Sequence, residues 1–155
     1  MKFSCRWKVT PLLPYESRAQ RGLRVLVVED EFLLACTLEE DLVSFGFAVV
    51  GPFSGMRQAE HAASREALDL AVLDVNLRGE MVYPLAEHVM ERGIPVLFLT
   101  GYGLGVLPDK FRTTPILAKP YDLLALEGAI DRLLQSDIRS QKTLISVSKS
   151  RRAQH

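Results

Sequence analysis

Long apolar stretches and cysteines are both scarce in this sequence of 155 residues. The longest charge-free stretches, residues 42–56 and 93–108, are shorter than the roughly 18 to 20 apolar residues of a membrane helix, and Gly and Pro interrupt both. The amino terminus lacks the apolar run of about 7 to 15 residues that a signal peptide requires. The two cysteines, Cys5 and Cys36, provide neither a disulfide framework nor a CxxC metal site. We therefore expect a cytoplasmic protein without a membrane segment.

Charge is unevenly distributed, although the formal net charge is zero. Residues 25–137 contain 8 Lys/Arg against 18 Asp/Glu, whereas the two ends contain 11 against 1. The overall composition and the length suit one globular domain. We expect this domain at residues 23–136, between a flexible basic leader (1–22) and a flexible basic tail (137–155). Because no aromatic residue interleaves with the basic residues of the tail, we interpret the tail as solvated rather than as a nucleic-acid-binding segment.

Short β-branched runs alternate with longer segments of helical period from Arg24 onward. This alternation is typical of βα units around a parallel sheet. The link between the last two strands contains three Gly and a Pro at residues 101–108, and each Gly costs a helix about 1 kcal/mol relative to Ala. The helix in that link should therefore be short, irregular or mobile. The expected strands are residues 25–28, 47–50, 70–75, 95–100 and 115–118. The expected helices are 32–45, one that follows Ser54 as its cap and runs to about 65, 84–92, and 122–135 capped by Asp122.

Polar residues stand at the carboxyl ends of four of the five expected strands. In an open parallel sheet, functional groups collect at this edge, so Asp30 and Asp74 should lie within several ångströms of each other. Two carboxylates 4 Å apart repel by about 4 kcal/mol at an effective dielectric near 20. A divalent cation would remove this repulsion, and oxygen ligands with room for water and phosphate suit Mg²⁺. The strand-end residues are Glu29, Asp30, Glu31, Asp74, Thr100 and Lys119.

The order and spacing of these strand ends resemble the receiver domain of two-component response regulators. The resemblance covers residues 23–136 and implies a flavodoxin-like α/β fold with a doubly wound five-stranded parallel sheet of order 2-1-3-4-5. It implies that Asp74 is the phosphoacceptor and that Thr100 and Lys119 contact the phosphoryl group. The implied phosphodonor is a sensor histidine kinase or a histidine phosphotransfer protein.

The same resemblance implies a Mg²⁺ site beside the phosphoacceptor. Asp30 would be a direct ligand, and Glu29 an outer acidic partner of the ion. Asp74 and the backbone carbonyl of Asn76 would complete the protein's share of the metal shell.

Two local features qualify the resemblance. Ile116 stands three residues before Lys119, where most receivers carry a Tyr or Phe whose ring turns inward on activation. The segment FLTGYG, residues 98–103, is similar to the motif of the FATGUY subclass of stand-alone receivers, although Leu99 replaces the alanine. In that subclass the fourth helix is poorly formed, in agreement with the glycines noted above. We predict that phosphorylation orders residues 101–113 instead of rotating a preformed helix.

We interpret the chain as a single-domain response regulator that is not a turnover enzyme. Its output would be protein binding, or it would serve as a phosphate sink for a shared kinase. One alternative is a Mg²⁺-dependent aspartyl-phosphate phosphohydrolase, but the haloacid dehalogenase family uses Asp-x-Asp where residues 74–76 read Asp-Val-Asn. Another is a receiver-like module that binds its partner without phosphate.

Overall fold

The structure is a computed structural model that describes residues 22–101 and 107–152, with side chains described as far as residue 137. The leader expected at residues 1–22 lies outside this description except for Gly22. The elements, in chain order, are β1 (Arg24–Val28), α2 (Phe32–Ser44), β2 (Ala48–Phe53), α3 (Met56–Arg65), β3 (Leu70–Asp74), β4 (Asn76–Leu77), β5 (Glu80–Met81), α4 (Tyr83–Glu91), β6 (Val96–Thr100), the 3-10 helix η1 (Asp109–Phe111), β7 (Ile116–Ala118) and α5 (Leu123–Arg152).

Five parallel strands form the central sheet in the order β2-β1-β3-β6-β7. Counted along the chain without the short β4 and β5, this is the expected order 2-1-3-4-5, so the predicted fold is confirmed. β3 lies between β1 and β6, and all five of its residues are buried, as its near-continuous apolar sequence indicates. β2 is an edge strand, which explains how it continues through Pro52 beyond the expected end at residue 50.

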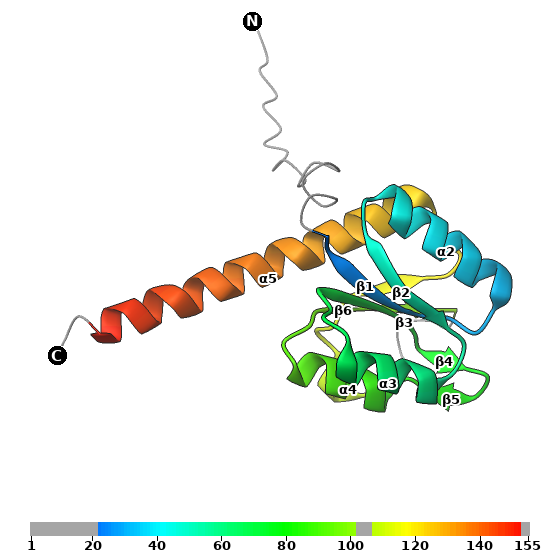
Figure 1. Ribbon diagram of the computed structural model, residues 1–155, viewed down its shortest axis with the longest axis horizontal. Coiled ribbons are helices and arrows are strands. Elements are labelled where there is room, and N and C mark those ends of the chain that lie inside the picture. Colours follow the sequence, from blue (N-terminus) through cyan, green and yellow to red (C-terminus); the bar gives the residue numbers. More distant parts are fainter. Residues whose placement is uncertain (1–21, 102–106, 153–155) are drawn as a thin grey trace, which may run out of the picture.

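Helices cover both faces of the sheet, as Figure 1 shows. α3 and α4 cover one face, where alternate strand residues such as Leu26, Leu73 and Phe98 join one apolar cluster. α2 and α5 cover the other face, where Val27, Leu97 and their neighbours join a second cluster. This division follows from the alternation of side chains along each strand. The sheet therefore holds its strand ends in a fixed frame between two packed layers.

The last helix is longer than the sequence pattern suggested. α5 runs from Leu123 to Arg152, whereas we expected it to end at Gln135 and a flexible tail to follow. The composition does become polar after Ser136, but residues 136–155 contain no Gly or Pro that would end a helix. In Figure 1 the end of α5 projects away from the body. The change in composition thus marks where the helix leaves the sheet, and residues 153–155 lie outside the described residues.

The helix caps confirm one expectation and correct another. Asp122 precedes α5, and its Oδ1 accepts a hydrogen bond from the Ala125 N–H at 2.7 Å, as a cap does. Ser54 does not cap α3, because the helix begins one residue later, with Gly55 as its N-cap in an extended conformation. The first helical residue, Met56, is buried and belongs to the face that packs on the sheet. Packing of this face sets the start of the helix.

Two connections position the functional edge. Directly after β3, the two-residue strands β4 and β5 pair antiparallel in a small hairpin, which the sequence analysis did not predict. Between β6 and β7, the described residues contain only the 3-10 helix η1, in agreement with a short fourth helix. Residues 102–106 of that link lie outside the description. The described helices include none long and apolar enough to cross a membrane.

Candidate phosphoacceptor and cation site

The carboxyl ends of β1, β3, β6 and β7 surround an open pocket of about 600 Å³. Parallel strands end at one edge of the sheet, so residues far apart in sequence meet there. All six residues expected at the strand ends line the pocket, and the segment after β3 and Gly101 after β6 contribute the remainder. The lining residues are Glu29, Asp30, Glu31, Asp74, Asn76, Arg78, Gly79, Thr100, Gly101 and Lys119.

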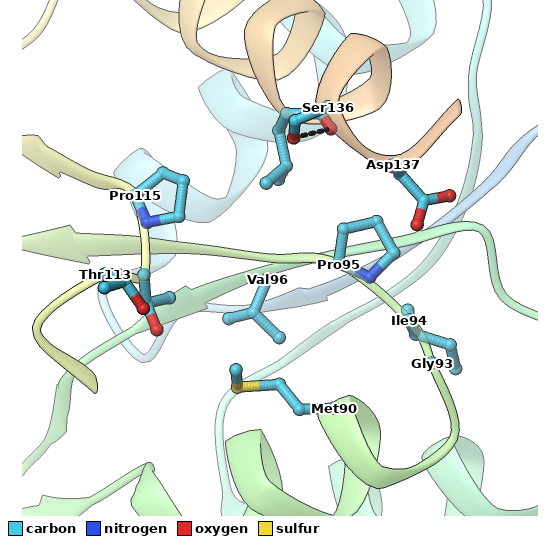
Figure 2. Close-up of a pocket in the computed structure, with 11 residues that line it drawn as sticks. Met90, Gly93, Ile94, Pro95, Val96, Thr113, Pro115, Ser136 and Asp137 are labelled. Carbon is cyan, nitrogen blue, oxygen red and sulfur yellow. Dashed lines mark hydrogen bonds between the residues drawn. The ribbon is translucent and has the colours of Figure 1, made fainter. Parts of the chain in front are cut away.

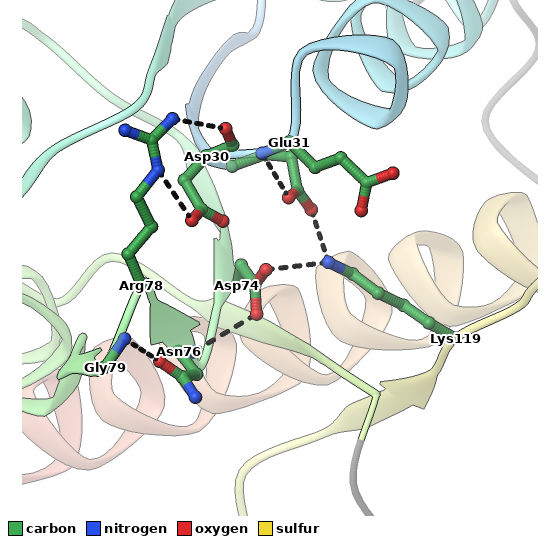
Figure 3. Close-up of polar contacts among 8 residues, drawn as sticks. Asp30, Glu31, Asp74, Asn76, Arg78, Gly79 and Lys119 are labelled. Atoms are coloured by element: carbon green, nitrogen blue, oxygen red, sulfur yellow. Dashed lines mark hydrogen bonds and ion pairs between the residues drawn. The ribbon is translucent and has the colours of Figure 1, made fainter.

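Lys119 connects the ends of two strands. Its Nζ lies 2.7 Å from Asp74 Oδ2 and 2.5 Å from Glu29 Oε2. Figure 3 shows the Lys119 ammonium directed toward Asp74. The Lys119 side chain is 15% exposed, and those of Asp74 and Glu29 are 10% and 1% exposed. One largely buried ammonium therefore neutralises part of the charge of two buried carboxylates.

Burial and pairing act in opposite directions on these ionisable groups. Burial alone lowers the pKa of Lys119, but hydrogen bonds from its ammonium to Asp74 and Glu29 outweigh burial, and the pKa is raised above 10.5. Burial also raises the pKa of Glu29 above 4.5, and the hydrogen bond from Lys119 only partly offsets this. The ammonium form of Lys119 is thus favoured at neutral pH.

Asp74 is held at the end of β3 by contacts on both carboxylate oxygens. Oδ2 accepts the hydrogen bond from Lys119, while Oδ1 accepts one from the Asn76 backbone N–H at 3.2 Å. Thr100, at the end of the neighbouring β6, is buried and lines the same pocket. Its carbonyl accepts a hydrogen bond from the Lys119 backbone N–H at 2.8 Å, which fixes the end of β7 beside β6.

Three carboxylates form a group that can hold a metal ion. One oxygen from each of Glu29, Asp30 and Asp74 lies within 4.8 Å of the others. This donor set fits a hard divalent cation such as Mg²⁺, because all three atoms are carboxylate oxygens. Asn76 also lines the pocket, as expected of the residue assigned to the metal shell through its backbone carbonyl.

Arg78 is a pocket residue for which no site was expected from the sequence. It occupies the turn of the β4–β5 hairpin, and its Nε lies 3.4 Å from Asp30 Oδ2. The hairpin turn is stabilised by a 2.6 Å hydrogen bond from the Gly79 N–H to Asn76 Oδ1. The Arg-Gly pair after Val75-Asn76-Leu77 was the available signal for this turn, but it does not reveal which way the Arg side chain points.

Large apolar side chains are exposed beside the pocket. Phe32 and Leu33 begin α2, directly after the acidic residues 29–31 that follow β1, and are 76% and 72% exposed. Leu124, in the first turn of α5, is 77% exposed. Both helices pack on the same face of the sheet, and both begin at the edge that holds the pocket. We call these three residues the apolar rim.

A second cavity lies at the other end of the strands, beside the amino-terminal ends of β6 and β7. It measures about 470 Å³ and is lined by residues that include Met90, Val96 and Asp137 (Figure 2). None of the residues expected at the functional site line this cavity.

Comparisons with known proteins point to one family, although no family model matches the chain. The transcriptional regulatory protein TctD of Salmonella typhimurium is 36% identical over 123 residues, which are 73% of this chain and 52% of TctD. The chain thus spans about half the length of this curated relative.

In the comparisons with solved structures, the match covers nearly the whole of the other chain. SdrG from Sphingomonas melonis Fr1 is 36% identical with a TM-score of 0.65, and the match covers 72% of this chain and 96% of SdrG. A structure of SdrG in its BeF3-activated conformation matches with 34% identity, a TM-score of 0.62 and coverage of 72% and 95%. A response regulator receiver protein from Sinorhizobium medicae WSM419 is 25% identical with a TM-score of 0.64, covering 76% of this chain and 98% of that protein.

Proposed function

Because this chain belongs to the receiver domains of two-component response regulators, we propose that Asp74 accepts a phosphoryl group from the phosphohistidine of a partner protein. Receiver domains generally imply a histidine kinase as partner, and the donor here would be such a kinase or a histidine phosphotransfer protein. The observation that carries the proposal is the contact of the Lys119 ammonium with Asp74, which is one of three clustered carboxylates. Receivers are typically phosphoacceptors rather than turnover enzymes.

The proposed transfer requires little activation of the nucleophile. An Asp74 carboxylate oxygen bonds to phosphorus while the bond from phosphorus to the donor imidazole nitrogen breaks and returns its electron pair to the imidazole. Negative charge accumulates on the phosphoryl oxygens during transfer, and the Lys119 ammonium is placed to stabilise it. The Thr100 hydroxyl lines the same pocket and would contact the transferred group.

The cation would be Mg²⁺, held by Asp30 and Asp74, with Glu29 as an outer acidic partner and the Asn76 carbonyl as a further ligand. When bound, it supplies positive charge that neutralises the incoming phosphoryl oxygens. Because Glu29 is 1% exposed and hydrogen-bonded to Lys119 and to the Glu31 N–H, its role is to orient the ammonium and the loop after β1.

We propose an output by protein binding or a role as a phosphate sink, in a stand-alone receiver similar to the FATGUY subclass. Ile116 lies opposite Phe98 in the sheet, where a ring switch is not available. Phe111 of η1 stacks on Tyr83 of α4 with ring centroids 5.2 Å apart. Because η1 and this ring contact are already formed, the predicted ordering of residues 101–113 cannot apply to residues 109–111. A shift of this link after phosphorylation would reach α4 through the ring contact.

The central experiment is incubation with acetyl phosphate and Mg²⁺ followed by intact-mass analysis. We expect a labile gain of one phosphoryl group that is lost in Asp74→Asn, whose side chain is matched in size but lacks the charged nucleophile. If the small donor gives no product, a phosphorylated histidine kinase replaces it. Absence of labelling from both donors, or equal labelling of Asp74→Asn, would refute the assignment. Sustained release of phosphate from an aryl phosphate, abolished by Asp74→Asn, would instead support a phosphohydrolase.

A further inference from the structure

We propose that Arg78 competes with the divalent cation for Asp30 and thereby sets the cation affinity of the pocket. The inference rests on the proposed function, because it concerns the Mg²⁺ site beside the phosphoacceptor. It assigns a specificity-determining role to a residue of the β4–β5 hairpin, four positions after Asp74 in the chain.

The hairpin places Arg78 beside the metal-binding carboxylates. Arg78 and Gly79 both have positive φ, 52° and 93°, which is the backbone of a tight two-residue hairpin turn. The Gly79 N–H donates to Asn76 Oδ1, so the turn is tied to the strand that follows Asp74. The base of the Arg78 side chain therefore has a defined position relative to the phosphoacceptor.

The guanidinium makes two contacts with one residue. Nε lies 3.4 Å from Asp30 Oδ2, and Nη2 donates a hydrogen bond of 3.3 Å to the Asp30 backbone carbonyl. Figure 3 shows the Arg78 side chain reaching from the hairpin to Asp30, across from Lys119. Asp30 is the carboxylate assigned as the direct cation ligand, so Arg78 and the cation compete for the same carboxylate group.

The two cationic side chains of the pocket differ in how readily they can be displaced. Lys119 is 15% exposed and bound to Glu29 and Asp74, whereas the Arg78 side chain is 77% exposed and pairs with Asp30. A cation that binds Asp30 would also stand close to the Arg78 guanidinium, and like charges at such distances repel. Cation binding therefore weakens the pairing of Arg78 with Asp30, and this lost pairing reduces the net affinity.

The size of the effect follows from the exposure of the pair. An ion pair with one solvent-exposed partner is weak, so its loss corresponds to a change of about two- to fivefold in a dissociation constant. Salt screens an exposed pair, so this difference should shrink as ionic strength rises.

The test is titration of the full chain with Mg²⁺ by isothermal titration calorimetry at low salt. Arg78→Gln removes the charge with little change in length, and Arg78→Gly removes it with a residue suited to positive φ. Both should bind Mg²⁺ about two- to fivefold more tightly than the wild type. Arg78→Lys, which keeps the charge but not the two-point contact, should lie between. Circular dichroism without Mg²⁺ should be unchanged in all three.

The matched control is Arg112→Gln, which removes an exposed arginine from an ion pair with Asp109 outside the pocket. This variant should bind Mg²⁺ with the wild-type affinity. In 0.5 M salt, the difference in Mg²⁺ affinity between Arg78→Gln and the wild type should largely disappear. Asp30→Asn should lose the binding signal, which shows that the wild-type signal comes from this pocket. Mg²⁺ binding by Arg78→Gln and Arg78→Gly that is equal to or weaker than that of the wild type would then overturn the role of Arg78 but leave the cation site itself in place. A wild type that binds no Mg²⁺ would overturn both this inference and the cation part of the proposed function.

Discussion

Lys119 is the residue on which the charge balance of the pocket depends. Its ammonium crosses from the end of β7 to carboxylates at the ends of β1 and β3, so it links strands that are not neighbours in the sheet. Without it, Glu29 and Asp74 would remain buried with like charges facing each other. Breaking a buried pair by removing one partner is costly because the remaining charge is uncompensated.

We therefore expect Lys119→Met to destabilise the Mg²⁺-free protein by about 3 kcal/mol at pH 7, measured by urea unfolding. Added Mg²⁺ should restore part of this loss. The pKa of Glu29 is already raised in the folded state by burial, and removal of Lys119 raises it further. A raised folded-state pKa gives stability that is present below the unfolded value and lost as pH rises, so the deficit should shrink toward pH 4.5.

The comparison for this prediction is Arg112→Gln. The Arg112–Asp109 pair is exposed on both sides, and its loss should cost less than about 1 kcal/mol. A Lys119→Met deficit no larger than that of Arg112→Gln would show that the buried contacts contribute little to folding.

The sequence was enough to predict that the site residues converge, but not that Arg78 contacts Asp30. Apolar patterns define the strands, and parallel strands all have their carboxyl ends on the same side of the sheet. Asp74, Thr100 and Lys119, which stand at these ends, were therefore expected to lie together. The position of Arg78 depends on two positive φ angles in the six-residue stretch NLRGEM, whose two-residue strands are too short for an apolar pattern to indicate them. Its role in this site is consequently a conclusion from structure alone.

Among the elements, α5 carries the clearest local signal. Its start is defined by Asp122, whose carboxylate accepts the Ala125 N–H, and the Asp122 carbonyl accepts the Leu126 N–H at 3.1 Å. This cap lies three residues after Lys119, so it also fixes the chain that leaves the pocket.

Asp122→Ala should lower the free energy of unfolding by about 1 kcal/mol, because an N-terminal backbone N–H of the helix loses its acceptor. Asp122→Asn keeps the acceptor oxygen and should remain within a few tenths of a kcal/mol of the wild type. Urea unfolding monitored by circular dichroism measures both. Equal stability of the two variants would mean that the side-chain cap does not contribute.

Other element boundaries escaped prediction for physical reasons. Ser54 is a good cap residue by type, but burial of Met56 begins α3 after Gly55 instead. The end of α5 was placed at Gln135 from the loss of apolar residues, yet a helix without Gly or Pro continues past the point where its apolar face ends. Cap residues and the hydrophobic period therefore predict that these helices exist, but they predict the first and last residues of the helices less well.

For the molecule as a whole, the apolar rim and the pocket occupy one edge. Phe32 and Leu33 directly follow the pocket residue Glu31, and Leu124 stands five residues after Lys119. Under the proposed function, a donor histidine would approach this end of the sheet. Exposed apolar side chains beside a polar cleft are typical of protein-binding surfaces. This arrangement supports contact of the phosphodonor with the first turns of α2 and α5.

Phe32→Ser and Leu124→Ser should slow phosphotransfer from a phosphorylated histidine kinase at least about fivefold, the loss expected when a contributing interface residue is truncated. Labelling by acetyl phosphate should be unchanged, because the small donor does not use the rim. Met90→Ser is the control, since Met90 is 40% exposed on α4, which covers the other face of the sheet. Equal slowing with both donors would place the defect in the pocket, contrary to the expectation.

The length of α5 has a mechanical consequence. The helix is clamped to the sheet by buried residues such as Leu126, Ile130 and Leu133, and it then continues to Arg152, about 28 Å beyond Leu133 at 1.5 Å per residue. If the clamped part tilts by about 5°, the far end sweeps roughly 2 to 3 Å, as a lever does about its pivot. A displacement too small to disturb the packing of the core would thus be magnified at the outer end of this helix.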